Sequence, residues 1–402
     1  MVRKNDISTI KRVKLAHLIA RMGTGGAEEN TSYTIRGLDK AKYEIDLIVG
    51  DEFGNHYERI FQKEKIKVIQ ISRFIGNLNF WYDITLFINL IKIFYRNRYD
   101  IVHTHGTKAG IIGRIAAKIT GVPIIIHGLH GSALDAFSSK WLNILFLYLE
   151  RLAGSFTDAH ISVSTILSQN YLKQKIGKAE RYYTVRSGME LSNFFQDNEP
   201  GIEAIRKEFS IGPDDFVIGN ISRLELLKGH SLLLRAFKIL REQEKDKSRR
   251  IILMIIGDGE EKDNIYQDIK KLGLEKSVIL KGYRNDIPNI LATIDLLVHT
   301  SFREGLPRVL VQAAATGIPM VAFNVDGIPE IIRDGYNGFL VEPKNINQLV
   351  EKITIYLRKP ELLKMHGDNS KKVVKNRWTI EGMVKGTDKI YSKLIEEKIS
   401  SI

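Results

Sequence analysis

The sequence predicts an α/β protein made of two Rossmann-like, doubly wound domains that face a cleft. The chain has 402 residues, which is enough for two domains of ordinary size. Short apolar segments alternate with amphipathic helical patterns, as they do in parallel βα units. The alternation loosens near Ser187–Phe195, passes a linker-like segment at Asn198–Gly201, and restarts at Phe216. Two similar domains are therefore expected.

The first series of βα units occupies residues 1–195. Strands are expected where apolar runs are short, and helices where apolar residues recur at three- and four-residue spacing. The expected strands are Val13–Ile19, Tyr43–Val49, Lys67–Ile71, Asp100–His103, Pro123–His127, Ala159–Ser164 and Tyr183–Val185. The expected helices are Ala27–Leu38, Phe80–Tyr95, Ala109–Thr120 and Ser139–Leu152.

The second series occupies residues 196–378, and a last amphipathic helix lies within 379–402. The expected strands are Phe216–Ile221, Ile251–Ile256, Val278–Leu280, Leu296–His299, Pro319–Phe323 and Phe339–Val341. The expected helices are Gly229–Gln243, Asn264–Leu272, Ile287–Ile294, Arg308–Thr316, one opened by Pro329, Gln348–Arg358, Pro360–Asn369 and Ile380–Lys398. Pro307 suits a first helical turn, and Gly317 suits a left-handed helix end.

Composition limits the functional classes. The chain is 44% hydrophobic and 27% charged, as foldable globular proteins are, and it contains no cysteine for a disulfide or thiolate metal site. The basic N-terminal segment lacks a long apolar core and a cleavage site, so no signal peptide is expected, and no run is long enough to span a membrane. A cytoplasmic location is expected. Peripheral attachment to the inner face of the cell membrane is a further hypothesis.

The positive charge is uneven along the chain. Residues 1–195 hold 27 Lys+Arg against 17 Asp+Glu, a net +10 of the total +13. This excess favours an anionic partner, either a phosphate-bearing molecule or an anionic membrane surface. Nucleic acid is disfavoured because the basic residues are not interleaved with aromatics in a recognisable module. A solvated basic surface without a partner remains the alternative.

The segment from His299 to Pro343 contains two consecutive strand–loop–helix units. Its loops and helix N-termini should meet at the carboxyl edge of a parallel sheet, where open α/β sheets bind ligands. Glu304 lies in the first loop. It is interpreted either as an exposed loop charge or as a hydrogen-bond acceptor for sugar hydroxyls beside a phosphate, and the second interpretation is slightly favoured.

The same segment carries a family resemblance. EGLPRVLVQA, followed by GIPMVA and GIPEIIRDGYNG, resembles the donor-binding signature of the retaining glycosyltransferase family 4, which has the GT-B fold. The family places a second Glu after Glu304 and seven further residues, but this chain has Gln312 there. Asp326 likewise stands where the family commonly has glycine. The resemblance covers nearly the whole chain, most strongly residues 216–343.

The resemblance implies a role for each domain and for particular residues. Residues 1–195 would bind the acceptor, 196–378 would bind the donor, and 379–402 would pack back on the first domain. Arg223 and Lys228 match the family's diphosphate clamp, and Glu304 would hold sugar hydroxyls. The remaining donor-binding residues would be Gly257, Gly259, Tyr283, Gly305, Leu306, Pro307 and Gln312, with Gln312 at the ribose.

Glycines and histidines mark the first domain's loops. Gly25 and Gly26, in RMGTGGAEE, are either a tight βα turn or part of a phosphate-binding loop, and the resemblance favours the latter. The resemblance also assigns the transferred sugar to His130, with His127 as second candidate, and a junction turn to Gly188. His103 and His105 are expected to support the cleft; a metal site formed by the histidine pairs is the least favoured interpretation.

The predicted function is transfer of a sugar from a nucleotide diphospho-sugar, with UDP favoured over GDP, to an acceptor hydroxyl. The resemblance implies retention of the anomeric configuration, in cell-surface polysaccharide or lipid-linked glycan synthesis. No Asp-x-Asp motif stands in a suitable loop, so no metal and no cofactor are expected. The apolar faces within Phe80–Tyr95 and Trp141–Leu149 suit either a membrane-borne acceptor or the protein core.

Other functions remain as alternatives. A nucleotide-sugar epimerase would need further acid–base carboxylates, and an NAD-dependent enzyme would need the full dinucleotide fingerprint, which the glycine-rich loop lacks. A non-catalytic nucleotide-sugar-binding protein of the same fold is the main alternative, because Gln312 and Asp326 both depart from the family pattern.

Overall fold

The computed structural model describes residues 12–23, 25–74, 79–131, 139–196, 198–244 and 249–399. The chain forms two compact units. The first contains the residues up to Gly188 together with those from Ile380 onward, and the second is Met189–Thr379. The sequence placed the division after residue 195, just past the 3-10 helix Ser192–Phe194.

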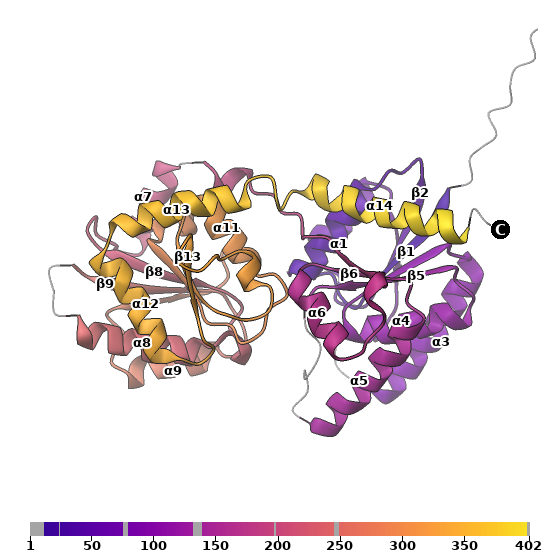
Figure 1. The fold of residues 1–402 in the computed structure, drawn as a ribbon, viewed down its shortest axis with the longest axis horizontal. Helices are drawn as coiled ribbons and strands as arrows, with labels where there is room; N and C mark the ends of the chain where they lie inside the picture. Colours follow the sequence, from indigo (N-terminus) through magenta and orange to yellow (C-terminus); the bar gives the residue numbers. More distant parts are fainter. Residues whose placement is uncertain are drawn as a thin grey trace, which may run out of the picture. The chain divides into compact units, whose positions relative to one another are not determined.

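The first unit is built on a seven-stranded parallel sheet with the order β3-β2-β1-β4-β5-β6-β7 (Figure 1). Its strands are β1 (Val13–Ile19), β2 (Tyr43–Val49), β3 (Lys67–Gln70), β4 (Ile101–His105), β5 (Ile124–Leu129), β6 (Ala159–Ser162) and β7 (Tyr182–Thr184). Its helices are α1 (Gly26–Gly37), α2 (Asn55–Lys63), α3 (Phe80–Asn97), α4 (Thr107–Ile119), α5 (Lys140–Ser155), α6 (Thr165–Lys173) and α14 (Ile380–Lys398).

Apolar side chains on both faces of this sheet are buried under helices. On one face, Leu15, Leu47 and Ile126 of the strands form a core with residues of α1, α2 and α14. On the other face, Leu18 and Val102 pack with residues of α3 and α4. Strands buried on both sides read as nearly continuous apolar runs, which is why their positions were evident from the sequence.

The last helix, α14, belongs to the first unit. It packs on α1 through buried apolar residues, among them Met383 and Leu394. Asp388 accepts hydrogen bonds from Lys42 Nζ at 2.8 Å and from the hydroxyl of Tyr43 at 2.7 Å. The helix thereby covers one face of the sheet over strands β1, β4 and β5.

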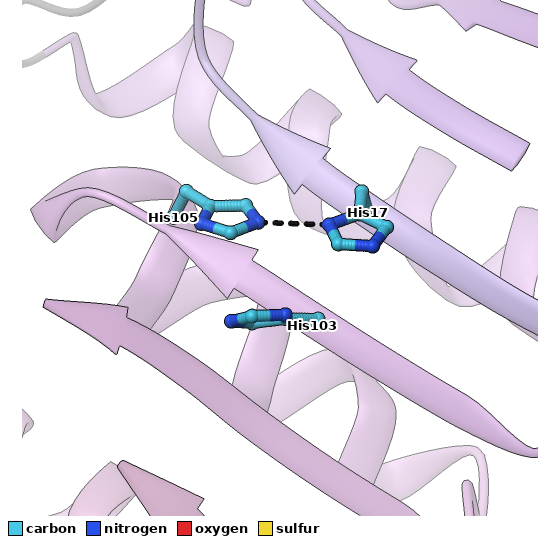
Figure 2. Close-up of side chains that lie close together, drawn as sticks. All are labelled: His17, His103 and His105. Atoms are coloured by element: carbon cyan, nitrogen blue, oxygen red, sulfur yellow. Dashed lines mark hydrogen bonds between the residues drawn. The ribbon is translucent and has the colours of Figure 1, made fainter. Parts of the chain in front are cut away.

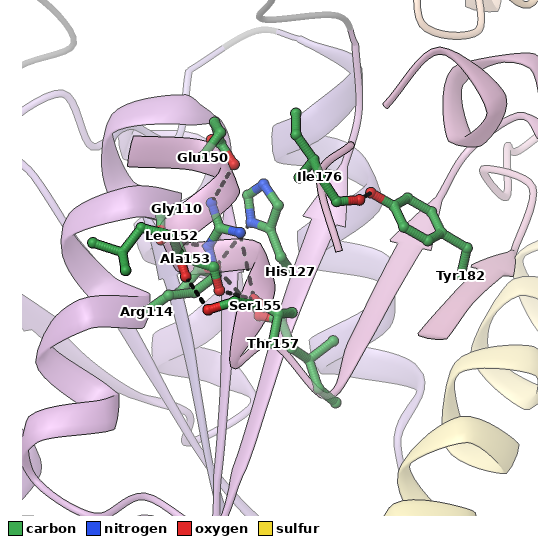
Figure 3. Close-up of polar contacts among 12 residues, drawn as sticks. Gly110, Arg114, His127, Glu150, Leu152, Ala153, Ser155, Thr157, Ile176 and Tyr182 are labelled. Atoms are coloured by element: carbon green, nitrogen blue, oxygen red, sulfur yellow. Dashed lines mark hydrogen bonds and ion pairs between the residues drawn. The ribbon is translucent and has the colours of Figure 1, made fainter. Parts of the chain in front are cut away.

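A buried ion pair joins α4 to α5 on the opposite face (Figure 3). Arg114 Nη2 lies 2.6 Å from Glu150 Oε2, and both side chains are at most 3% exposed. Arg114 Nε also donates to the Gly110 carbonyl at 2.8 Å. Each charge of the pair neutralises the other, whereas either charge buried alone would destabilise the folded state.

The second unit repeats the architecture with six parallel strands in the order β10-β9-β8-β11-β12-β13. Its strands are β8 (Phe216–Ile221), β9 (Ile251–Ile256), β10 (Val278–Lys281), β11 (Leu296–His299), β12 (Met320–Phe323) and β13 (Gly338–Val341). Its α-helices are α7 (Glu199–Glu208), α8 (His230–Gln243), α9 (Lys262–Lys271), α10 (Ile287–Thr293), α11 (Arg308–Thr316), α12 (Ile346–Arg358) and α13 (Glu361–Val374). Two large parallel sheets, one in each unit, confirm the predicted α/β fold.

Some local predictions were wrong. The expected linker at Asn198–Gly201 is the start of α7, where the Asn198 side chain caps the helix by accepting a hydrogen bond from the Gly201 N–H. The helix expected after Gly327 is a single 3-10 turn, Ile328–Glu330. The short helices α2 and α6 were not predicted. Within the described residues, no helix combines the length and the apolar character needed to cross a membrane.

Candidate functional site

Both sheets have a switch point, where the strand order reverses. In the first sheet it lies between β1 and β4, and in the second between β8 and β11. Ligands of open α/β sheets bind beyond the carboxyl ends of the strands at such points. The polar residues of this chain gather at these two places.

In the second unit, the loops after β8 and β11 are bound to each other. Thr300 Oγ1 donates to the Lys228 carbonyl at 2.9 Å, and the Phe302 N–H donates to the Leu227 carbonyl at 2.9 Å. Gly229 has φ +69°, and a Cβ there would lie 2.4 Å from the Thr300 carbonyl oxygen. Glycine at 229 therefore permits the close approach of the two loops.

Glu304 lies where these loops meet. Its Oε1 accepts hydrogen bonds from Lys228 Nζ at 2.6 Å and from His299 Nε2 at 2.8 Å. Burial acts to raise the pKa of Glu304, but the hydrogen bonds and charges of His299 and Lys228 outweigh it and lower the pKa to about 2. The carboxylate is therefore ionised at neutral pH and held in one position.

Asp326 holds the backbone of the same loop. Its Oδ2 accepts a hydrogen bond from the Glu304 N–H at 2.7 Å. Asp326 has φ +43°, a conformation that Asp adopts more readily than most residues. Partial burial raises the pKa of Asp326. Asp326, which stands where glycine was expected, thus fixes the backbone of the loop that contains Glu304.

Arg223 is not part of this cluster in the structure. Its guanidinium lies 2.8 Å from Glu225 Oε1, and its side chain is 55% exposed. Of the two residues predicted to clamp a diphosphate, only Lys228 contacts Glu304. Arg223 lies in the loop between β8 and the 3-10 helix Leu226–Lys228.

The glycines of the next loop have a clear structural role. A Cβ at Gly257 would lie 1.8 Å from the Ser222 carbonyl oxygen, and one at Gly259 would lie 2.4 Å from the Leu224 carbonyl oxygen. Both have positive φ, at +149° and +156°. They bring the loop after β9 against the backbone after β8. Tyr283, in the loop after β10, is 62% exposed.

The remaining predicted donor residues follow Glu304 directly. Gly305, Leu306 and Pro307 are buried and lead into α11, for which Pro307 is the N-terminal cap residue. Gln312 lies within α11 and is partly buried. The first turn of α11 presents backbone N–H groups at the same edge of the sheet as Glu304, an arrangement that favours anions.

In the first unit, histidines gather at the switch point between β1 and β4 (Figure 2). His17 pairs in register with His103, and Ile19 with His105, so the three histidines share one face of the sheet. His17 Nδ1 and His105 Nε2 are 3.0 Å apart, and His105 Nδ1 and His130 Nε2 are 2.9 Å apart. His103 Nδ1 is 2.5 Å from the hydroxyl of Tyr391 in α14.

These imidazoles are neutral. Burial lowers the pKa of His17 to about 3 and that of His130 to about 4, and it holds the pKa of His103 and of His105 well below 6.5. Neutral imidazole nitrogens are metal ligands and hydrogen-bond partners, not cations.

A glycine makes room beside the histidines. A Cβ at Gly128 would lie 2.6 Å from His105 Nδ1 and 3.1 Å from the Nε2 atoms of His103 and His130. A cavity of about 10 Å³, lined in part by these residues, adjoins the cluster. This volume suffices for about one water molecule.

His127 lies on the other face of the sheet from His130. It pairs in register with Thr104, and its Nδ1 is 2.9 Å from Thr104 Oγ1. Gly110 of α4 leaves room for its ring. Figure 3 shows His127 beside the buried Arg114–Glu150 pair. The structure thus separates the two histidines that the sequence proposed as first and second candidates for one role.

The remaining predicted residues of the first unit lie at turns and caps. Gly25 is the N-terminal cap of α1, with extended φ of −175°, and Gly26 is the first residue of that helix. The Gly188 N–H donates to the sulfur of Met383 at 3.1 Å. Neither glycine of the first loop has a positive φ.

Two residues of these clusters were not singled out from the sequence. His17 had no motif around it, and only the register of β1 against β4 reveals its neighbours. His299 is the last residue of β11, as His105 is of β4. A histidine at the carboxyl end of a parallel strand was the one feature of the sequence that could have marked His299 as a site residue.

The comparisons with known proteins agree with this architecture. Residues 24–193 match the model of the Glycosyltransferase Family 4, and residues 201–373 match the model of the Glycosyl transferases group 1. The chain is 27% identical over 390 residues to an Escherichia coli protein described as UDP-Gal:alpha-D-GlcNAc-diphosphoundecaprenol alpha-1,3-galactosyltransferase, covering 97% of this chain and 98% of that protein.

Further relatives come from polysaccharide synthesis and from solved structures. The chain is 26% identical to the capsular polysaccharide biosynthesis glycosyltransferase CapM of Staphylococcus aureus, covering 90% of this chain and 93% of that one. The structure of Anabaena HepE in complex with UDP-glucose superimposes with a TM-score of 0.78 at 23% identity, covering 95% of this chain and 100% of that one.

The fold and the family matches together define a glycosyltransferase of the GT-B type. The chain belongs to the glycosyltransferases that join a Family 4 N-terminal part to a group 1 C-terminal part, as the sequence resemblance indicated. Its relatives include enzymes of bacterial polysaccharide and lipid-linked glycan synthesis.

Proposed function

We propose that the protein transfers a sugar from a UDP-sugar to a hydroxyl of a lipid-linked glycan, with retention of the anomeric configuration. The observation that carries the proposal is the Glu304 carboxylate, buried and fixed by Lys228 and His299 at the switch point of the second sheet. A fixed acceptor for sugar hydroxyls beside a cationic side chain fits a sugar joined to a diphosphate.

The relatives support the choice of substrates. The E. coli relative is named as using UDP-galactose and an acceptor on diphosphoundecaprenol, and it matches nearly the full length of both chains. HepE was solved with UDP-glucose. We therefore take uridine as the base, a hexose as the sugar, and a polyprenyl-diphosphate-linked glycan as the acceptor class.

The proposed reaction exchanges one bond for another at the anomeric carbon. The bond from C1 to the diphosphate oxygen breaks, and a bond from C1 to the acceptor oxygen forms on the same face. The acceptor's hydroxyl proton passes to the departing diphosphate. Lys228, joined by Arg223 after a rotamer change, stabilises the negative charge that grows on the leaving group.

Glu304 positions the transferred sugar in this proposal, because it accepts hydrogen bonds from the sugar hydroxyls. In the first unit, His105 Nδ1 lies 2.9 Å from His130 Nε2 and holds that ring in place. Gln312 contacts the ribose through its amide. Because the two cationic side chains offset the diphosphate charge, we propose that this step requires no metal ion.

The acceptor would reach the first unit from a membrane surface. The helices α3, α4 and α5 cover one face of the first sheet and lie next to one another (Figure 1). The inner side of α3 is core, with Leu86, Leu90 and Phe94 buried. The outer sides are apolar: Trp81 of α3 is 73% exposed and Trp141 of α5 is 65% exposed. Exposed apolar patches of this kind mark interaction surfaces.

The charges on these three helices favour an anionic lipid surface. The only acidic residues of α3 and α5 are Asp83 and Glu150, and each is paired inward with a cation of α4, Lys108 or Arg114. Basic residues remain on the outer side, among them Lys92, Arg96, Lys118 and Lys140. An apolar and basic face without exposed carboxylates suits the interface of an anionic bilayer.

The experiment is a thermal-shift screen of UDP- and GDP-sugars on the native chain, Arg223→Ala and Glu304→Ala. A donor at a hundredfold excess over its dissociation constant should stabilise the native chain by about 2.7 kcal/mol. The proposal predicts stabilisation by a UDP-sugar and its loss in Arg223→Ala. If no nucleotide sugar shifts the native chain at millimolar concentration, the donor-site assignment fails.

A non-catalytic nucleotide-sugar-binding protein is the second candidate. It is favoured by Gln312 and Asp326, which replace the family's acid and glycine. Binding of a donor without transfer to any polyprenyl-linked acceptor, and without slow hydrolysis of the donor, would establish that candidate in place of the enzyme.

A further inference from the structure

We propose that His17, His103 and His105 form a binding site for a divalent transition-metal ion, zinc above all, at the switch point of the first sheet. One ring nitrogen from each of the three residues lies within 4.8 Å of the others. The three side chains come from adjacent strands, β1 and β4, whose pairing fixes their spacing. Figure 2 shows the three rings next to one another, with the contact between His17 and His105 drawn as a dashed line.

Two of the nitrogens already have the separation expected for ligands of one ion. His17 Nδ1 and His105 Nε2 are 3.0 Å apart. Two nitrogens bound to one tetrahedral zinc at 2.0–2.1 Å lie about 3.3 Å from each other. A metal would therefore replace the single proton that these two nitrogens share.

The cluster also contains a nitrogen that lacks a partner. His103 Nε2 is buried and has no hydrogen-bond partner among the described residues. An unpaired polar atom in the interior calls for a ligand or an ion. Three neutral imidazoles without a nearby carboxylate are the donor set that zinc accepts in three-histidine sites.

The surroundings supply what a metal site needs beyond its ligands. Histidine ligands usually donate their second ring N–H to another group, which fixes the tautomer. His103 Nδ1 lies at 2.5 Å from the Tyr391 hydroxyl, and His105 Nδ1 lies at 2.9 Å from His130 Nε2. With these two Nδ1 atoms engaged, the Nε2 atoms of His103 and His105 are presented to the ion, together with Nδ1 of His17.

A fourth ligand has space. The cavity of about 10 Å³ is lined by His103, His105 and the backbone of Gly128. It can hold about one water molecule next to the nitrogens. A water bound there would complete a tetrahedral site with one exchangeable position.

The site is separate from the donor chemistry of the second unit. Its effect would be on the first unit: the ion joins β1 to β4, and it fixes the tautomer of His105 that donates to His130. His130 would then keep its ring orientation whether or not a sugar is bound. The proposal does not depend on the transfer reaction, because its test measures metal binding.

The test uses the full chain purified without a histidine tag and freed of metal with a chelator. Zinc is added in steps, bound zinc is measured by elemental mass spectrometry after desalting, and thermal stability is recorded with and without zinc. Cobalt(II) is titrated in parallel for its visible absorption in a tetrahedral nitrogen site. We expect one ion per chain, a higher melting temperature with zinc, and the absorption of four-coordinate cobalt.

Variants locate the site. His103→Gln and His17→Gln should each abolish stoichiometric binding, and Tyr391→Phe should weaken it about 10- to 100-fold. His160→Gln is the matched control, because His160 is equally buried, yet it pairs in register with His127 on the other face. The control should bind zinc as the native chain does.

Several outcomes would overturn the proposal. Failure of the metal-free native chain to take up zinc at micromolar concentration is the first of these, and it needs no variant. Binding that survives in His103→Gln, or that is lost in His160→Gln, would place the ion elsewhere. If His103→Gln does not fold, Tyr391→Phe and His17→Gln carry the same comparison.

Discussion

Lys228 and Glu304 are 76 residues apart in the sequence, yet Lys228 Nζ lies 2.6 Å from Glu304 Oε1. The contact exists because β8 and β11 are neighbours at the point where the strand order reverses. His299 contacts the same oxygen from the end of β11. One carboxylate oxygen thus receives hydrogen bonds from the loop after β8 and from the end of β11.

This relationship predicts how the second unit responds to acid. The pKa of Glu304 is lowered from 4.5 to about 2, so the folded state binds a proton at this carboxylate less tightly than the unfolded state. Its stabilising contribution is therefore complete above pH 4.5 and is lost as the pH falls toward 2. Each pKa unit is worth about 1.4 kcal/mol, which gives about 3 kcal/mol in total.

The measurement is denaturant unfolding of the native chain and Glu304→Gln between pH 2 and pH 7. The native chain should be the more stable of the two at pH 7, and the difference should shrink below pH 4.5. A difference that stays constant over this range would mean that Glu304 is not held as an ionised group.

Asp326 should act through its hydrogen bond and not through its charge. Burial raises the pKa of Asp326, so the folded protein disfavours the ionised carboxylate. Ionisation of Asp326 therefore lowers the free energy of unfolding, and this loss is largest at pH values above the raised pKa. Asp326→Asn keeps an acceptor for the Glu304 N–H and suits the positive φ. It should be at least as stable as the native chain at pH 7, whereas Asp326→Ala should lose about 1–3 kcal/mol.

Thermal unfolding at pH 7 compares the two variants, and donor affinity is measured on both. We expect Asp326→Asn to bind donor normally and Asp326→Ala to bind it more weakly, because the Glu304 loop loses its anchor. Equal behaviour of the two variants would show that the hydrogen bond does not matter.

The buried Arg114–Glu150 pair should show strong coupling. Arg114→Met leaves Glu150 as a buried unpaired charge and should destabilise the first unit by about 3–5 kcal/mol. The double variant Arg114→Met/Glu150→Leu should recover much of this loss, since no charge is left without a partner. A double-mutant cycle by denaturant unfolding measures the coupling. Additive effects of the two substitutions would contradict the pairing.

The outer faces of α3 and α5 should bind anionic membranes. Sedimentation with vesicles of mixed neutral and anionic lipid should capture the native chain, and less of it as the salt concentration rises. Trp81→Glu and Trp141→Glu should reduce the bound fraction several-fold. Tyr266→Glu, at an exposed aromatic residue of the second unit, is the control. Equal binding by all variants would show that α3 and α5 do not form the membrane-binding surface.

The sequence predicted the fold well where strands are buried on both faces. The boundaries of Phe216–Ile221, Ile251–Ile256 and Tyr43–Val49 agree with the structure, because continuous apolar runs bounded by turns have few other interpretations. Short helices such as α2 gave weak periodicity. Asn198, as a helix cap, resembled a linker because caps and turns favour the same residue types.

The candidate sites were only partly predictable. Glu304 and Lys228 belong to recognisable motifs, and the structure brings them together. His17 and His299 have no motif, and their positions follow from strand order and register, which a single sequence does not reveal. His127 and His130 are close in sequence, but the alternation of side chains along β5 and the residue beyond it places them on opposite faces.

The most direct test of the central claim is an assay of sugar transfer by the native chain and Glu304→Gln. Both are incubated with UDP-hexoses and a polyprenyl-diphosphate-linked acceptor in vesicles, and released UDP and the linked product are quantified. We expect the native chain to form an α-linked product with one UDP per transfer, and Glu304→Gln to lose at least about 100-fold in rate. Undiminished transfer by Glu304→Gln, or a β-linked product, would contradict it.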